Sequence, residues 1–512
     1  MKKNIFITIT ILAFAIAVNS CSKQLDLAPV SSLSDASYWK TPDQVDAFVS
    51  GIEQAFRNNT LSFELLGEGR ADIFGTDPGS SSAFTGEATQ GVENLWNNTL
   101  DGNNPGVSNY GGFYFNINQI NLLISKLNTL NIVTPENKNY YLGMAYGMRA
   151  FYYFQLYKSW GKVIVQTEPT TAIDVSNLAK PASREDSVIA LIKSDIDLSV
   201  NSFGNDYSFR NQKGYWSKAA TLMLKAHVYL WTSYRGGGSA DATTALDALN
   251  DIETNIPSLH LLPHFEDVFA SGNKGNAEII LAIHNELNES SLPFAGTFEP
   301  QTGLIANYYD SAENRKFDVT NDNWGGLLRA PVKIATFRQF DDKDSRKWAS
   351  ITAAYTMDGG NYQIAGAFVS KYKGEQNAGS REYTNDYPVY RYADLLLLKA
   401  EAEVILGQDP SNEINLVRAR AFAADYDPAV QGYPNQPVDA DPKEAILQER
   451  FYEFIFEGKR WYDLRRMDPS GKYVFEYTSV SSSEPYKLLW PIDRNTLTNN
   501  PALEQTPGYP TF

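Results

Sequence analysis

The only cysteine of this 512-residue chain stands at position 21, directly after an apolar run that extends over residues 5–18. Lys2 and Lys3 precede the run and Ser20 ends the segment. Spanning a bilayer takes about 20 apolar residues, so the pattern predicts a secretory signal peptide and not a membrane helix. A chain with one cysteine forms no internal disulfide, so a packed core must hold the fold together.

Cys21 is the expected site of a covalent lipid. A small residue directly before a cysteine, at the end of the apolar run, is typical of a bacterial lipoprotein signal, in which cleavage leaves the cysteine as the acylated N-terminus. We therefore expect a signal peptide over 1–20 and a polar, flexible leader over 21–40. A buried free thiol is the alternative, and the cleavage position favours lipidation. One acyl chain holds only marginally, so a protein partner at the membrane is also expected.

The composition limits the partners and the fold. Hydrophobic residues make up 43% of the chain, which is enough for one large domain or two closely packed ones. The net charge of -16 and the pI near 4.8 argue against nucleic acid, which is bound by clustered Lys and Arg. The same acidity gives no attraction to anionic lipid headgroups.

Apolar side chains recur at helical spacing in much of the chain, which indicates a mainly α fold. The expected helices cover about 41–57, 113–130, 139–160, 217–234, 392–406, 412–423 and 442–463. Several of them share a pattern of Ala, Leu and Tyr residues that suggests stacked helix pairs like tetratricopeptide units, although the repeat length is not strictly constant.

Two regions lack this periodicity. Residues 67–112 are rich in Gly, Ser, Asn and Asp, which predicts a long loop region, and loops of that length are usually functional. Residues 236–386 give mixed signals, with a short β-type run at 278–283, and we interpret them as irregular structure over a helical scaffold. The expected halves are 41–235 and 236–512.

Catalytic signatures are missing from the sequence. It contains no P-loop, no dinucleotide-binding glycine pattern, no nucleophile elbow and no paired-histidine zinc motif. His260 and His264 have helical spacing, but Pro263 between them would break the helix, so a packed or solvated pair is favoured over a metal site. His227 lies in an apolar segment and is interpreted as a helix-packing residue. We expect no catalytic residue, no metal and no cofactor.

Two acidic segments favour a structural interpretation. The run 341–346 lacks the Gly and the distal Glu of an EF-hand, so a capping or salt-bridged turn is expected. Glu449, Glu453 and Glu457 share a helix face, which repels itself unless cations neutralise it. The cations near enough in sequence are Arg450, Arg460, Arg465 and Arg466. A structural ion network is favoured over a glycosidase-like acid/base pair, because the sequence context singles out no two carboxylates as such a pair.

Aromatic residues within polar, Gly-rich segments are the candidates for ligand contact. Aromatic rings stack on the apolar faces of sugars, while Asn, Asp and Arg bind the hydroxyls. Trp96, Tyr110 and Trp324 stand in such segments. The alternative is that each ring closes the top of the core; for Trp96 this is at least as good an interpretation, and for Trp324 ligand contact is favoured.

Several motifs together resemble a known family. The segments are 449–466 (ERFYEFIFEGKRWYDLRR), 391–402 (RYADLLLLKAEA) followed by Asn415 and Arg418, 149–161, and 500–509. Their sequence and order resemble the SusD/RagB family of Bacteroidetes outer-membrane lipoproteins over nearly the whole mature chain.

This resemblance implies a mainly helical fold in which tetratricopeptide-like helix pairs support an irregular ligand-binding half with few short strands. It also implies a lid at the cell surface that passes captured nutrient, most often oligosaccharide, to a SusC-like TonB-dependent transporter in the outer membrane. The matching motifs are scaffold, so by position in polar loops we expect Asp72, Trp96, Trp324 and Arg381 near the ligand. Peptide cargo, as in the RagB branch, is the alternative, and a surface hydrolase has the least support.

Overall fold

The computed structural model describes residues 38–76, 84, 90–170, 179–310, 312–313 and 315–511. The expected signal peptide, Cys21 and nearly all of the expected leader lie outside the described residues. None of the helices in these ranges has the length and apolarity that crossing a membrane requires.

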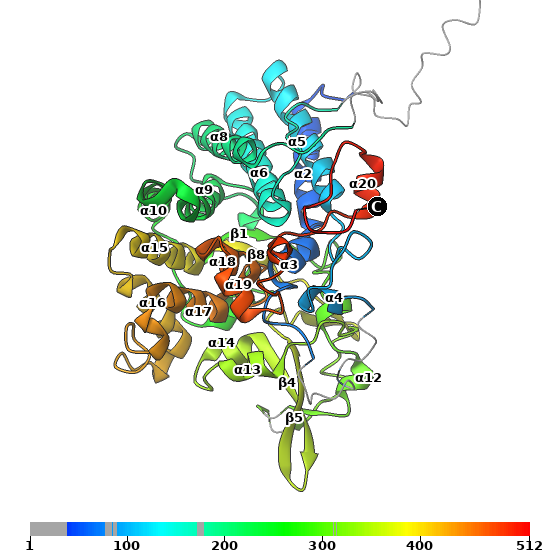
Figure 1. Ribbon diagram of the computed structural model, residues 1–512, viewed down its shortest axis with the longest axis vertical. Coiled ribbons are helices and arrows are strands. Elements are labelled where there is room, and N and C mark those ends of the chain that lie inside the picture. The colour runs from blue at the N-terminus through cyan, green and yellow to red at the C-terminus, as the bar shows by residue number, and fades with distance from the viewer. Residues whose placement is uncertain are drawn as a thin grey trace, which may run out of the picture.

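The first half of the body is built from helices that pack side by side (Figure 1). They are α2 (Pro42–Arg57), α3 (Thr60–Glu68), α4 (Glu93–Trp96), α5 (Tyr110–Thr129), α6 (Pro135–Trp160), α8 (Glu185–Phe203), α9 (Lys218–Thr232) and α10 (Gly238–Asn255), with a π-turn at Ser233–Gly237 between the last two. Helix α5 packs on α6, α6 on α8, α8 on α9 and α9 on α10. Neighbours in sequence are therefore neighbours in space, as in stacked helix pairs.

The longest helix, α6, shows how the sequence sets these elements. Pro135 occupies its first turn and the Thr134 hydroxyl accepts a hydrogen bond from the Asn137 N–H at 3.2 Å, so the helix starts with a satisfied cap. It ends at Gly161, whose φ of 75° suits glycine. Gly147 allows close approach, because a Cβ there would lie 2.2 Å from the Trp216 indole nitrogen.

The second half continues the helical stack. Its helices are α15 (Tyr392–Leu406), α16 (Ser411–Phe422), α17 (Pro442–Phe454), α18 (Arg460–Met467), α19 (Lys472–Tyr477) and α20 (Arg494–Asn499), joined by 3-10 turns at Ala423–Asp425, Pro437–Ala440 and Pro485–Leu488. Helix α15 packs on α10, α16 and α17. It has the expected bounds and buries all four leucines of 395–398. The mainly α fold is confirmed.

The single helix expected over 442–463 is wrong. Helix α17 ends at Phe454 and α18 begins at Arg460, because Phe456 (φ 66°) and Gly458 (φ 64°) adopt left-handed backbone. The carboxylate of Glu68 accepts hydrogen bonds from the freed N–H groups of Phe456 (2.8 Å) and Glu457 (3.1 Å). A buried acid from α3 thus caps a break that periodicity alone conceals.

The region 236–386 is more regular than expected. It opens with the eighteen-residue α10 and contains most of the strands. Its strands and short helices are β1 (Ile279–Ile283), α11 (Ala295–Phe298), α12 (Thr302–Ile305), β2 (Tyr309–Asp310), β3 (Arg315–Lys316), α13 (Ile334–Gln339), α14 (Ser345–Ser350), β4 (Ile351–Asp358), β5 (Asn361–Val369), β6 (Glu375–Asn377) and β7 (Ser380–Glu382), with 3-10 turns at Asn211–Lys213 and Phe265–Val268 nearby.

Three antiparallel sheets arise from these strands. The largest has the order β3-β2-β4-β5, β6 pairs with β7, and β1 pairs with β8 (Tyr387–Arg391), directly before α15. The β4–β5 hairpin projects from the end of the molecule opposite α5 and α8 (Figure 1). The sheet places the hairpin beside the loops that form the candidate site.

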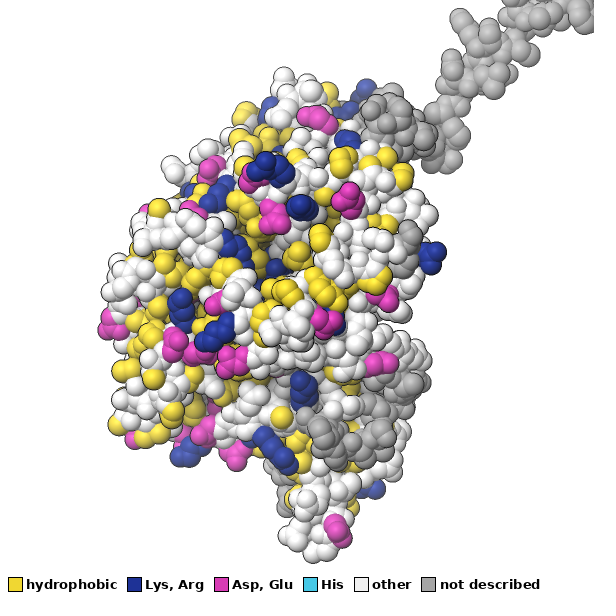
Figure 2. Space-filling view, in the orientation of Figure 1, with side chains coloured by type: hydrophobic (Ala, Val, Ile, Leu, Met, Phe, Trp, Pro, Cys, Tyr) yellow, Lys and Arg dark blue, Asp and Glu magenta, His cyan; other side chains and the backbone are white. Residues whose placement is uncertain are grey.

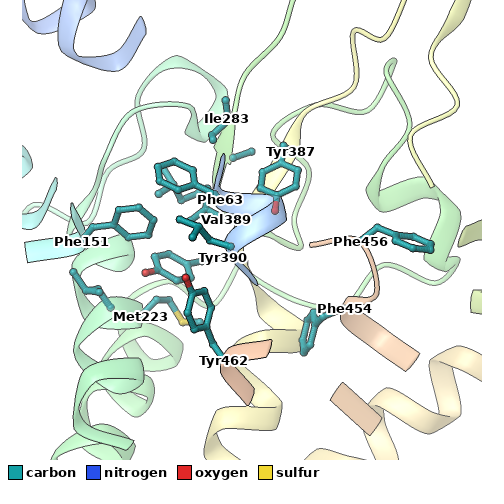
Figure 3. Packing of buried hydrophobic residues seen from close by; sticks show 14 of the residues in the cluster. Phe63, Phe151, Met223, Ile283, Tyr387, Val389, Tyr390, Phe454, Phe456 and Tyr462 are labelled. Atoms are coloured by element: carbon teal, nitrogen blue, oxygen red, sulfur yellow. The ribbon is translucent and has the colours of Figure 1, made fainter. Parts of the chain in front are cut away.

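The core joins the two halves. Figure 3 shows Phe63, Phe151, Val389, Tyr390 and Tyr462 gathered at its centre. They come from α3, α6, β8 and α18, and all of them are buried. Aromatic rings meet edge to face there, as Phe63 and Phe151 do at 5.4 Å between centroids. Such packing replaces the disulfides that the chain cannot form.

A buried ion network stiffens the second half. The predicted structural network around the glutamates of α17 is confirmed, but the arginines that pair with Glu453 are not the expected ones. Glu453 pairs with Arg346, Arg391 and Arg420, none of which was expected from sequence. The cations expected to neutralise the three glutamates bind elsewhere: Arg450 pairs with Asp394 and Asp463, Arg460 with Asp72, Arg466 with Glu401 and Asp463, and Arg465 donates to the Lys158 carbonyl. His227 belongs to the same network, 2.9 Å from the Asp394 carboxylate, and burial lowers its pKa to about 4.

Candidate functional site

An open cavity of about 230 Å³ lies at the base of the β4–β5 hairpin. Its aromatic lining consists of Phe317, Trp324, Trp348 and Tyr355. Its charged lining consists of Asp310, Glu313, Arg315, Asp322, Lys373 and Arg381. We call this cavity the tryptophan pocket. Apolar rings with a few polar groups around them are the usual composition of a small-molecule site.

Trp324 forms one wall of the tryptophan pocket. Its ring meets Phe368 of β5 edge-on, with 5.2 Å between centroids, and the side chain is 7% exposed. Its backbone carbonyl accepts a hydrogen bond from the Tyr383 hydroxyl. The indole N–H is buried and has no hydrogen-bond partner among the described residues. Buried donors of this kind are normally satisfied, by protein, water or ligand.

The loop that carries Trp324 is held tightly. The Gly326 N–H donates to the Pro300 carbonyl at 3.1 Å, and the Leu328 N–H to the Glu299 carbonyl at 2.8 Å. A Cβ at Gly326 would lie 2.0 Å from the Glu299 carbonyl oxygen, so only glycine fits. The Gly-rich composition therefore marks close backbone approach here, and Trp324 is fixed in position.

Arg381, on β7, clamps the same loop from the other side. Its guanidinium donates to the carbonyls of Asn323 (2.9 Å), Asn321 (3.1 Å) and Lys373 (2.5 Å). Its Cζ atom also lies 4.5 Å from the centroid of the Trp324 ring. A planar guanidinium can stack and donate at once, which an ammonium cannot.

Ion pairs of Arg315 shape the rim of the pocket. Arg315, on β3, binds Asp322 through two nitrogen atoms, at 2.5 and 3.0 Å, and its Nε binds Glu313 at 2.5 Å. Burial raises the pKa of Asp322, but the hydrogen bonds from Arg315 outweigh it and the net pKa is lowered. Asp322 is thus a charged acceptor at ordinary pH.

Trp348 and Tyr355 complete the aromatic lining. Trp348 is 38% exposed, and its indole N–H donates to the Asp342 carbonyl at 2.9 Å, so the ring is anchored while part of it faces solvent. Tyr355 is half-buried on β4. Sequence reasoning missed both residues, because an aromatic ring in an ordinary helix or strand carries no local signal of exposure.

Of the four residues expected near the ligand, Trp324 and Arg381 come together in the tryptophan pocket, and Asp72 and Trp96 are not in its lining. Asp72 accepts two hydrogen bonds from the Arg460 guanidinium, at 2.9 and 2.8 Å. Trp96 is 7% exposed, and its carbonyl accepts from the Ser479 hydroxyl at 2.6 Å. A ligand role for these two residues stays a prediction.

Two further cavities suit a ligand less well. One, of about 60 Å³, lies inside the core between Lys158, His227 and Tyr462. The other, of about 450 Å³, is lined by Arg346 and Glu449, which are already paired with each other at 2.6 Å. Of these three cavities, only the tryptophan pocket is lined by a tryptophan that is partly exposed to solvent, Trp348.

In the part of the chain that the structure describes, no group of three or more His, Cys, Asp or Glu side chains is placed to hold a metal ion. The run at 341–346 is a capping turn as expected, since the Asp344 carboxylate accepts from the N–H of Arg346 at 2.9 Å at the start of α14. On the face drawn in Figure 2, basic and acidic side chains are interspersed, without a basic patch for nucleic acid.

Comparison with known proteins gives consistent matches along the chain. A model of the SusD family matches residues 339–509, and a model described as "Starch-binding associating with outer membrane" matches residues 25–230. The solved structure of NanU from B. fragilis is 43% identical, covers 95% of this chain and 100% of its own, and has a TM-score of 0.86. SusD-like protein P38 from Formosa agariphila is 29% identical, with 99% of each chain covered. The starch-binding protein SusD of Bacteroides thetaiotaomicron is 30% identical over 133 residues, 24% of this chain and 22% of its own.

The fold and the site define a class: a stacked-helix scaffold with a loop-borne aromatic pocket at one end. The chain belongs to the SusD family.

Proposed function

We propose that this protein is a lipid-anchored protein of the outer-membrane surface that binds nutrient oligosaccharide in the tryptophan pocket and delivers it to a SusC-like TonB-dependent transporter. It acts by binding and not by catalysis. The family description names starch binding and association with the outer membrane, which supports both the cargo class and the location.

The observation that carries this proposal is the combination of Trp324 and Trp348 in one open cavity. Sugar rings present apolar faces that can stack on the exposed part of the Trp348 indole, and the surrounding carboxylates and cations can bind hydroxyl groups. Three acidic and three basic side chains line the cavity, so their charges balance. A balanced lining suits a neutral polyhydroxylated ligand better than a charged peptide.

The test is equilibrium binding of the unacylated mature protein to a library of immobilised oligosaccharides, with a peptide library beside it. We expect saturable binding to at least one glycan and loss of affinity in Trp348→Ala. Phe115→Ala is the matched control, because Phe115 is a 63% exposed aromatic residue on α5, at the other end of the molecule. Binding only to peptides would favour the peptide-carrying alternative, and binding to neither would contradict the proposal.

The anchor and the transporter need separate tests. Cys21→Ala should release the protein from the membrane fraction and leave glycan affinity unchanged, because the residues that line the tryptophan pocket all lie between Asp310 and Arg381. Copurification of a TonB-dependent transporter with the membrane-bound protein would support delivery. Loss of glycan binding in Cys21→Ala would contradict the separation of anchor and site.

A further inference from the structure

The β4–β5 hairpin and the neighbouring strand β2 carry three tyrosines beside the tryptophan pocket. Tyr309 of β2 pairs with Tyr355 of β4, and Tyr362 of β5 pairs with Met357 of β4. Because cross-strand partners share a face and alternate residues return to it, all four side chains lie on one face of the sheet. Tyr355 also lines the pocket, so this tyrosine face is continuous with it.

The three rings form one cluster. Tyr362 lies 5.9 Å from Tyr309 and 6.0 Å from Tyr355 between ring centroids, at interplanar angles of 58° and 70°. All three residues are half-buried, and the neighbouring Met357 is 44% exposed. Among the described residues, the hydroxyl groups of Tyr309 and Tyr355 have no hydrogen-bond partner. The cluster thus offers both apolar ring surface and uncommitted hydroxyls.

The hairpin holds this face in a fixed shape. Strand pairing runs without a gap from Asp358–Asn361 at the tip to Ile351–Val369 at the base, apart from one irregularity after Ala354. Gly359 (φ 54°) and Gly360 (φ 85°) make the tight turn, and left-handed backbone at both positions fits the twist of a two-residue hairpin. Exposed apolar surface on a paired, projecting element is typical of an interaction site.

We propose that the tyrosine face of Tyr309, Tyr355 and Tyr362 is a second carbohydrate subsite, so that the ligand is an oligosaccharide long enough to extend from the tryptophan pocket along the hairpin. This inference rests on the proposed function. It assigns the terminal sugars to the tryptophan pocket and the following sugars to the tyrosines. A disaccharide would then occupy the pocket alone, and a hexasaccharide would reach both parts.

The test compares the disaccharide and the hexasaccharide of the linkage that binds in the oligosaccharide library, by calorimetry. We expect Tyr362→Ala and Tyr309→Ala to weaken hexasaccharide binding about 2- to 12-fold each, and to leave disaccharide binding unchanged. Tyr362→Phe keeps the ring and should retain most of the hexasaccharide affinity. Gln363→Ala, an exposed change on the opposite face of the same strand, should alter neither affinity.

The outcomes separate the two proposals. If the wild-type protein binds neither sugar, the proposed function fails and the second subsite fails with it. If the wild type binds and the tyrosine variants weaken both lengths equally, or neither, the second subsite is wrong and the tryptophan pocket stands. Trp348→Ala, which changes the pocket itself, should weaken both lengths and serves as the internal reference.

Discussion

The guanidinium carbon of Arg381 lies 4.5 Å from the centre of the Trp324 ring, while its nitrogen atoms bind three backbone carbonyls of the surrounding loops. One side chain therefore fixes the loop at 321–323 and covers the indole. This contact joins two residues that are 57 positions apart in the sequence, and it gives the tryptophan pocket a defined wall.

Arg381→Lys should weaken glycan binding although it keeps the charge. Lysine cannot donate in three fixed directions or stack flat on indole, so the loop at 321–323 should be held less firmly. For a half-exposed group, loss of about 1 kcal/mol corresponds to about fivefold weaker binding. Calorimetric titration measures the change. Lys472→Arg, a change of an exposed cation outside the pocket lining, is the control and should leave the affinity unchanged. Equal affinity in wild type and Arg381→Lys would show that only the charge of residue 381 matters.

Gly67→Ala should destabilise the fold strongly. A Cβ at Gly67 would lie 1.7 Å from the Gly458 carbonyl oxygen, at the break between α17 and α18. Gly51→Ala is the matched control, since nothing lies within 4 Å of a Cβ there, and alanine in a helix interior should add about 0.5–1 kcal/mol of stability. Urea unfolding of the two variants measures the loss of stability expected for Gly67→Ala and the gain expected for Gly51→Ala. A Gly67→Ala protein as stable as wild type would mean that α3 and this break do not touch.

Glu453→Gln should lower the free energy of unfolding by about 3–5 kcal/mol, because it removes the one buried anion that Arg346, Arg391 and Arg420 share. Glu453 is fully buried and its carboxylate lies 2.6 Å from Arg391 and 3.2 Å from Arg346. Asp186→Asn is the control, since the Arg184–Asp186 pair is exposed and should contribute nothing measurable. If denaturant unfolding gives similar stabilities for both variants, the network is not structural.

The free energy of unfolding should fall as the pH rises towards neutral, because the carboxyl group of Glu64 is buried. Burial raises its pKa to about 7, against the lowering effects of the Tyr387 hydroxyl and Lys371. A raised carboxyl pKa means that the folded state holds the proton more tightly. The stability it contributes is therefore complete below the ordinary pKa near 4.5 and is lost as pH rises through about 7. Glu64→Gln should flatten the thermal-stability profile over this range, and an unchanged slope would contradict the assignment.

Much of the helical scaffold can be predicted from the sequence, because its signals are local. The helix at 392–406 follows from its apolar run, and the one at 42–57 from the Thr41-Pro42 start. The break after Phe454 cannot, because it depends on Glu68, nearly four hundred residues away. The ion partners of Glu453 were also missed, since Arg346, Arg391 and Arg420 are brought together only by tertiary packing.

The candidate site could be predicted only in part. Trp324 has a sequence signal, an aromatic residue in a Gly- and Asn-rich segment. Trp348 has none, because its exposure depends on how α14 sits against β4. Asp72 looks equally available in the sequence, yet Arg460 binds it through two hydrogen bonds. Loop composition identifies a region of ligand contact, and side-chain exposure decides which residues can take part.

The most direct test of the central claim is a crystal structure of the protein with the oligosaccharide that binds it most tightly in solution. We predict sugar density in the tryptophan pocket, with one ring stacked on Trp348 and hydroxyl contacts near Asp322 and Arg381. Density elsewhere with an empty tryptophan pocket, whether beside Trp96 and Asp72 or in the cavity lined by Arg346 and Glu449, would contradict it.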